Sequence, residues 1–132
     1  MKPIIFDSWP VVAFFENEPS AEKIEKLIVD ALKNNCEMKI SVINLGEIWY
    51  SYARARSEKI ADELIEKVHS MNIKPVSVDW KLARLAAGFK KQGGISYADC
   101  FAAALAKQSG GELVTGDREF QQFEQEVEIV WV

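Results

Sequence analysis

The 132-residue sequence predicts an α/β fold, in which a mostly parallel sheet lies between two layers of helices. Two observations support this prediction. Short apolar segments typical of buried strands alternate with longer segments in which apolar residues recur at helical spacing. Strands that are apolar throughout are typical of parallel sheets covered on both faces. We therefore expect a three-layer sandwich that forms one domain, residues 1–132.

The first half of the chain alternates between strand and helix. Residues 2–6, KPIIF, form the first expected strand, and residues 19–35 form a helix with apolar residues every three or four positions. The second strand is expected at 38–42, MKISV. A helix at 44–56 and another at 57–72 follow it.

The second half continues the same alternation. The third strand is expected at 74–78, KPVSV. Two helices, 79–92 and 96–110, are separated by one pair of glycines, and a second pair ends the later helix. The fourth strand is expected at 112–115, ELVT, and the last at 128–132, EIVWV.

Several classes of protein are disfavoured by the composition. The longest uncharged stretch near the amino end, SWPVVAFF, has eight residues, whereas a membrane span needs about 20. It also lacks the features of a signal peptide. Cys36 and Cys100 have no CxxC spacing and His69 is the only histidine, which argues against zinc. We expect a cytoplasmic protein with reduced thiols and no membrane partner.

Four acidic residues are expected at the carboxyl edge of the sheet. Asp7 directly follows the first strand, Asp117 follows the fourth, and Glu47 is expected in the first helical turn after the second. Asp99 lies in the first turn of the helix that leads into the fourth strand, so that turn starts at the same edge. Ligands of open α/β sheets bind at this edge.

Each of these acids also has a simpler interpretation as a helix cap. Two have the spacing of a capping box and two precede a helix. The four contexts are Asn44-x-x-Glu47, Ser96-x-x-Asp99, Asp7 and Asp117. Capping explains any one of them alone, but it does not require that separate segments bring carboxylates together.

Clustered carboxylates raise one another's pKa, and a bound cation relieves their repulsion. Ligands that are all oxygen favour Mg²⁺ or Mn²⁺, and a partly filled metal shell suits hydrolysis of phosphodiesters. The net charge of −4 argues against a broad basic face for nucleic acid. The four site carboxylates equal this excess, however, and a divalent cation offsets part of it. The acidity is therefore compatible with an RNA substrate and predicts weak nonspecific binding.

Four segments together resemble the PIN-domain ribonucleases, namely IIFDSW, SVINLGEIWY, SYADCFAAALA and LVTGDREF. The length of the chain and the order of these segments are most similar to the VapC toxins of bacterial and archaeal toxin–antitoxin pairs. This resemblance implies a five-stranded parallel sheet of order 3-2-1-4-5 and a cofactor that is Mg²⁺ or Mn²⁺. It also implies an RNA substrate, a homodimer and an inhibitory antitoxin.

The same resemblance implies roles for particular residues. The family's catalytic, metal-binding acids fall on Asp7, Glu47, Asp99 and Asp117. The positions that support such a site fall on Ser8, Asn44 and Thr115. The pair Trp9-Pro10 departs from the small or aliphatic residues usual in the family, which concerns the shape of the entrance.

Two further residues test this interpretation. Arg118 adjoins the last of the four acids and is a candidate contact to RNA phosphate, although a solvated surface arginine is the alternative. Asp79 follows the third strand and has the same local context as the catalytic acids. Because the third strand would lie at the edge of the sheet, we predict that Asp79 is only a cap.

The sequence therefore predicts a metal-dependent endoribonuclease that acts as the toxin of a toxin–antitoxin pair. One alternative is a catalytically inactive PIN-like binding module, which the complete set of acids disfavours. Another is a phosphatase-like phosphoryl hydrolase. The segment IIFDSW lacks the second aspartate, two residues after the first, that a haloacid-dehalogenase-like phosphatase has.

Overall fold

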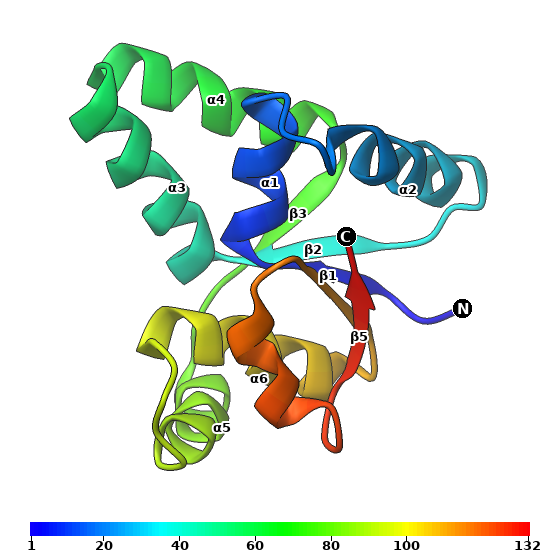
Figure 1. Cartoon of the computed structure of the whole chain (residues 1–132), viewed down its shortest axis with the longest axis vertical. Coiled ribbons are helices and arrows are strands. Elements are labelled where there is room, and N and C mark those ends of the chain that lie inside the picture. Colours follow the sequence, from blue (N-terminus) through cyan, green and yellow to red (C-terminus); the bar gives the residue numbers. More distant parts are fainter.

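A five-stranded sheet forms the middle of the protein in the computed structural model, which describes residues 1–132 (Figure 1). Its strands are β1 (Ile4–Phe6), β2 (Met38–Ser41), β3 (Ile73–Val76), β4 (Glu112–Thr115) and β5 (Glu128–Trp131). All neighbouring strands are parallel, in the order β3-β2-β1-β4-β5. The predicted sheet and its strand order are confirmed, and β1 lies at the centre.

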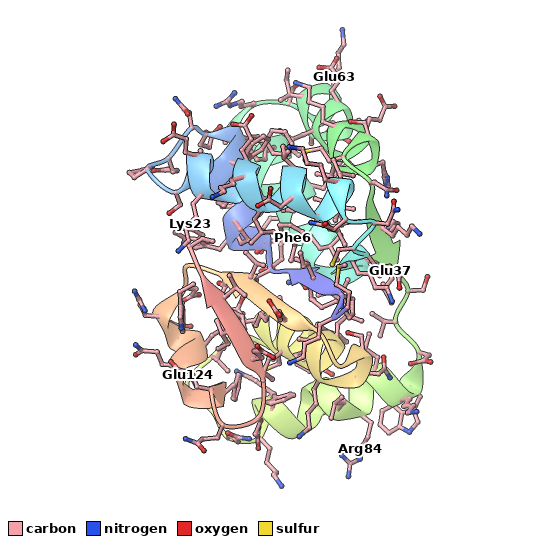
Figure 2. The ribbon with its side chains drawn as sticks, turned by 90° about the vertical axis from the view of Figure 1, so that its right-hand side faces the viewer. Phe6, Lys23, Glu37, Glu63, Arg84 and Glu124 are labelled. Atoms are coloured by element: carbon pink, nitrogen blue, oxygen red, sulfur yellow. The ribbon has the colours of Figure 1, made fainter.

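Helices cover both faces of this sheet. One face carries α1 (Ser8–Phe15), α2 (Ala21–Lys33), α3 (Val42–Ala55) and α4 (Glu58–Ser70). The other carries α5 (Trp80–Lys90), α6 (Tyr97–Ser109) and the 3₁₀ helix η1 (Arg118–Phe123). In Figure 2 the sheet is seen between the two layers, with Lys23 on the upper layer and Arg84 and Glu124 on the lower. None of the helices combines the length and the apolar character needed to cross a bilayer.

The side chains of the central strands alternate between two cores. Ile5 of β1 and Leu113 of β4 are neighbours in register, and both pack against α5 and α6. Phe6 and Val114, one residue further along, pack on the opposite face with α1 to α4. All four side chains are fully buried. This alternation, which follows from the two-residue repeat of a strand, confirms the predicted three-layer sandwich.

Helix α3 begins two residues earlier than the sequence predicts. Ser41 is its N-cap, because the Ser41 hydroxyl accepts a hydrogen bond of 3.1 Å from the backbone amide of Asn44. The predicted cap at Asn44 is therefore wrong, and Glu47 lies in the second turn rather than the first. The other predicted capping pair is present, since the amide of Asp99 donates to Ser96 Oγ at 3.1 Å.

Strand β3 also begins one residue earlier than predicted and ends at Val76. Asn72 has a φ of 62°, a left-handed conformation that asparagine tolerates, and it separates helix α4 from the strand. Pro75 lies within β3, where it has no amide to donate to a ladder. It is tolerated because β3 is an edge strand with only β2 as a neighbour.

Candidate active site

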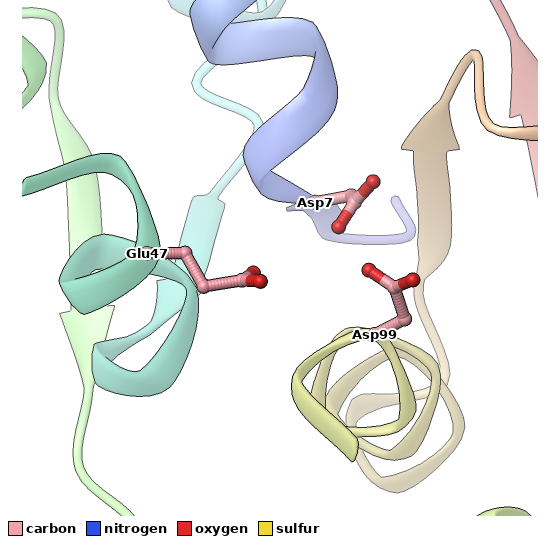
Figure 3. A group of neighbouring side chains, drawn as sticks. All are labelled: Asp7, Glu47 and Asp99. Atoms are coloured by element: carbon pink, nitrogen blue, oxygen red, sulfur yellow. The ribbon is translucent and has the colours of Figure 1, made fainter. Parts of the chain in front are cut away.

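Three carboxylates from different elements point toward one another at the carboxyl edge of the sheet (Figure 3). Asp7 follows β1, Glu47 is on α3 and Asp99 is on α6, and one oxygen from each lies within 4.8 Å of the others. Asp117 joins a second, adjoining group with Asp99 and Glu119 at the same spacing. The structure thus brings three of the predicted acids together and connects the fourth to them through Asp99.

Asp7 occupies the N-cap position of α1 but does not cap it with its side chain. Its Oδ2 instead accepts a hydrogen bond of 2.9 Å from Thr115 Oγ1. Its Oδ1 is buried and has no hydrogen-bond partner, and the residue as a whole is only 1% exposed. The interpretation of Asp7 as a cap is therefore wrong. A buried carboxylate oxygen without a partner is costly, so it needs a proton or a cation.

Burial raises the pKa of Asp7 from its ordinary 3.8 to about 7. The negative charge of Asp99 adds to this rise, and that of Glu47 contributes less. The hydrogen bond from Thr115 and the nearby backbone amide of Ser8 act in the opposite direction, since they stabilise the carboxylate. Without a cation, this carboxyl therefore holds its proton up to nearly neutral pH.

Asp99 is perturbed in the same direction. Burial raises its pKa to about 6, and the charges of Glu47, Asp117 and Glu119 contribute to the rise. The nearby hydroxyl group of Ser96 lowers it. Two neighbouring carboxyls with raised pKa values favour the binding of a cation, which would relieve the repulsion between their charges.

Glu47 is held in place by a hydrogen-bond network that ends on α6. Its Oε1 accepts from Ser8 Oγ and from Asn44 Nδ2, each at 3.1 Å. Asn44 is fully buried, and its Nδ2 also donates to the Ala98 carbonyl at 3.2 Å. Its Oδ1 accepts from Ser41 Oγ at 2.7 Å. Because both bonds to Glu47 end on Oε1, Oε2 remains available for a cation.

Thr115 connects the central carboxylate to Asp117. Its hydroxyl donates to Asp7 and accepts from the backbone amide of Asp117 at 3.1 Å. Asp117 caps η1, since its Oδ1 accepts from the Glu119 amide at 3.0 Å, so the cap interpretation holds for this residue. The guanidinium of Arg118 lies 4.6 Å from the ring centre of Trp131 and does not line the cavity described next.

A cavity of about 400 Å³ opens at these carboxylates. Its lining residues are Asp7, Ser8, Trp9, Val12, Ala13, Glu18, Asp99 and Asp117. Sequence reasoning did not identify Glu18 or Glu119, because an isolated exposed glutamate carries no distinguishing signal. A second cleft of about 450 Å³, lined by residues of α2, β1 and β4, includes none of the clustered carboxylates.

The donor set fits a divalent cation. The clustered atoms are all carboxylate oxygens, which Mg²⁺ and Mn²⁺ prefer over the nitrogen and sulfur ligands of zinc. Asp7, whose Oδ1 is buried and unpartnered, belongs to this cluster, and a cation bound there would offset its buried charge. The clustering of the carboxylates and the burial of Asp7 therefore both favour a cation at this position.

Asp79 follows β3 and behaves differently from Asp7. Its Oδ1 accepts a hydrogen bond of 2.9 Å from the Leu82 amide, so it caps α5. It lies on the far side of β2 from β1 and belongs to neither carboxylate group. The predicted cap is confirmed.

Comparisons with known proteins agree with this fold. VapBC2 from Rickettsia felis, solved bound to a DNA fragment from the promoter, matches with 18% identity over 98% of each chain and a TM-score of 0.74. VapC20 from Mycobacterium tuberculosis, described as a sarcin-ricin loop cleaving toxin, matches with 15% identity over 90% of this chain and 93% of its own, with a TM-score of 0.69. FitAcB from Neisseria gonorrhoeae matches with 23% identity over 96% and 95% and a TM-score of 0.65.

At these identities the likeness concerns the fold. Among curated proteins no significant match was found. The family model of the PIN domain matches residues 4–126, which include all four predicted acids and four of the five strands. The chain therefore belongs to the PIN domain family.

Proposed function

We propose that this protein is a metal-dependent endoribonuclease that acts as the toxin of a toxin–antitoxin pair. The observation that carries the proposal is the buried, unpartnered Oδ1 of Asp7 within a cluster of three carboxylates. Membership of the PIN domain family and the fold shared with VapC20, described as a sarcin-ricin loop cleaving toxin, support it.

Asp7, Glu47 and Asp99 would hold Mg²⁺ or Mn²⁺ directly, and Asp117 would act through a water molecule. When bound, the cation supplies activation of water and neutralises the charge that develops on the scissile phosphate. A cluster of three carboxylates leaves positions in the metal shell for water and for phosphate oxygens.

The residues around the carboxylates fix their orientation before substrate arrives. Thr115 holds Asp7 by donating a hydrogen bond to its Oδ2, and it leaves Oδ1 without a hydrogen-bond partner. Ser8 and Asn44 do the same for Glu47 by occupying its Oε1. Such preorganisation avoids the cost of reorienting charges during the reaction, which is a main source of catalytic power.

The proposal includes two protein partners. Solved relatives of this fold are VapBC complexes, which supports a VapB-like antitoxin, and we also propose a homodimer. Helix α3 exposes Val42, Ile43 and Tyr50, each more than one-third accessible, and apolar residues of this kind suit a protein interface. Light scattering of the purified chain gives the oligomeric state. Co-purification with the product of an adjacent small reading frame tests the antitoxin.

Incubation of labelled RNA with the purified protein tests the enzymatic part. We expect cleavage with Mg²⁺ or Mn²⁺, none with EDTA, and loss of cleavage in Asp7→Asn. Asp79→Asn is the matched control, because it changes an aspartate in the same strand–Asp–helix context without touching the cluster. If no RNA is cut with either metal, the protein is a binding module and the nuclease proposal is wrong. If Asp79→Asn abolishes cleavage as Asp7→Asn does, the proposed site is wrong.

A further inference from the structure

Trp9 lies in the first turn of α1, two residues after Asp7, and lines the same cavity. It is 37% exposed, so part of a large aromatic surface is accessible beside the cluster of carboxylates. It is also the only aromatic residue among those that line the cavity. The network that holds the carboxylates does not use it.

Gly116 explains how the indole is held. A Cβ atom at Gly116 would lie 2.4 Å from Cη2 and from Cζ3 of Trp9, and 2.8 Å from Cε3. The φ of Gly116 is outside the left-handed region, so the backbone does not require glycine here. The glycine instead makes room for the six-membered ring of Trp9. This contact fixes the ring against the turn that connects Thr115 to Asp117.

The charge of the cavity favours contacts to RNA that do not depend on charge pairing. The charged residues that line it are all acidic, namely Asp7, Glu18, Asp99 and Asp117. No lysine or arginine is among the lining residues to pair with phosphate, so apart from the bound cation the cavity repels an RNA backbone. Base stacking on an aromatic ring does not depend on charge pairing and contributes about 1–3 kcal/mol per base.

We propose that Trp9 is a base-binding residue, on which the base of an unpaired nucleotide next to the scissile phosphate stacks. This inference rests on the proposed ribonuclease function. A base is one ribose away from its phosphate, so a phosphate held at Asp7 places a neighbouring base along the wall that contains Trp9. Stacking requires that the base be free of a partner strand, so the site selects single-stranded RNA.

The test measures binding separately from cleavage. The probe is a single-stranded RNA oligonucleotide that the wild type cuts, compared with versions that are abasic at each nucleotide beside the cut. Both are titrated by fluorescence anisotropy against Asp7→Asn, which retains Trp9 but should not cleave. We expect Trp9→Ala in this background to bind the intact RNA about tenfold more weakly, which is about 1.4 kcal/mol. One of the abasic RNAs should bind Asp7→Asn about tenfold more weakly than the intact RNA does. Adding Trp9→Ala should not weaken the binding of this abasic RNA further.

A purely structural role for Trp9 predicts a different result, because Trp9→Ala would then weaken intact and abasic RNA equally. That outcome would overturn the proposal. Trp80→Ala is the matched control, since Trp80 is 76% exposed on α5 and does not line the cavity. It should bind both RNAs as the parent does, and a loss equal to that of Trp9→Ala would also overturn the proposal.

Gly116→Ala provides a second, independent readout. Its methyl group would displace the indole, so it should weaken binding of intact RNA in the presence of Trp9 and have little effect once Trp9 is alanine. Equal losses in both backgrounds would contradict the inference. If the wild type cuts no RNA and Asp7→Asn binds none, the proposed function itself fails. If RNA is cut and bound but Trp9→Ala changes nothing, only the role of Trp9 fails.

Discussion

Replacing Asp7 by asparagine should make the metal-free protein more stable while it abolishes cleavage. The folded protein holds the Asp7 proton up to about pH 7, whereas the unfolded chain releases it near 3.8. Over this range the folded state binds more protons than the unfolded state, so the free energy of unfolding falls as pH rises from about 4 to about 7. Asparagine is a neutral analogue of the protonated carboxyl and does not incur this loss.

The magnitude follows from the pKa of Asp7. Its rise from 3.8 to about 7 corresponds to about 4 kcal/mol at full ionisation, at about 1.4 kcal/mol per pH unit. Relaxation of the site and entry of water reduce this value, so we expect a gain of about 2 to 4 kcal/mol for Asp7→Asn at pH 8. The gain should be small near pH 4, where the folded-state carboxyl is protonated and the unfolded-state carboxyl, with a pKa of 3.8, is only about half ionised.

Urea unfolding in EDTA at pH 8 and pH 4 measures this difference. Asp79→Asn serves as the control, because asparagine caps a helix about as well as aspartate and should leave stability nearly unchanged. Added Mg²⁺ should stabilise the wild type at pH 8 and stabilise Asp7→Asn much less. If Asp7→Asn is no more stable than the wild type in EDTA at pH 8, the carboxyl is not buried as described and the reasoning is refuted.

Three further changes have expected outcomes. Thr115→Val removes a hydrogen bond that lowers the pKa of Asp7, so the acid limb of the pH–rate profile should move to higher pH, and Thr115→Ser should restore it. An unchanged profile in Thr115→Val would contradict this. Asn44→Ala breaks the hydrogen-bond network to Glu47, so it should lower the free energy of unfolding by about 1–3 kcal/mol and reduce kcat. Urea unfolding measures the loss of stability. If neither quantity changes, the network is not needed. Asp117→Asn should reduce cleavage less than Asp7→Asn in the same assay, and an equal loss would assign Asp117 a direct metal contact.

Much of the fold could be predicted from the sequence, because its signals are local. Apolar segments and helical periodicity predicted the five strands and helices α2 to α6, whereas α1 and η1 were expected only as helices after Asp7 and Asp117, without bounds. Because the strands are parallel, their carboxyl ends all lie at one edge of the sheet. What local pattern cannot tell is which acid caps and which does not. Asp7 and Asp79 both stand between a strand and a helix, yet only Asp79 bonds the helix amides. The difference arises from the position of each strand in the sheet.

The remaining errors also have physical causes. Ser41 and Asn44 are both good cap residues, so the sequence alone did not fix the start of α3, and the structure selects Ser41. Gly116 has an ordinary turn context, and only the three-dimensional approach of Trp9 reveals why a side chain is excluded there. The start of α3 was a choice between two equally good cap residues. The role of Gly116 depends on a contact with Trp9, which is distant in the chain.

The carboxylate cluster is assembled from residues 7, 47 and 99, with residue 117 beside it, so its parts are distributed over most of the chain. No fragment of this protein carries the complete cluster unless it contains β1, α3, α6 and β4. For the proposed nuclease, a chain still emerging from the ribosome would lack the complete site until β4 has joined the sheet, and a single cut between these segments followed by their separation would end activity.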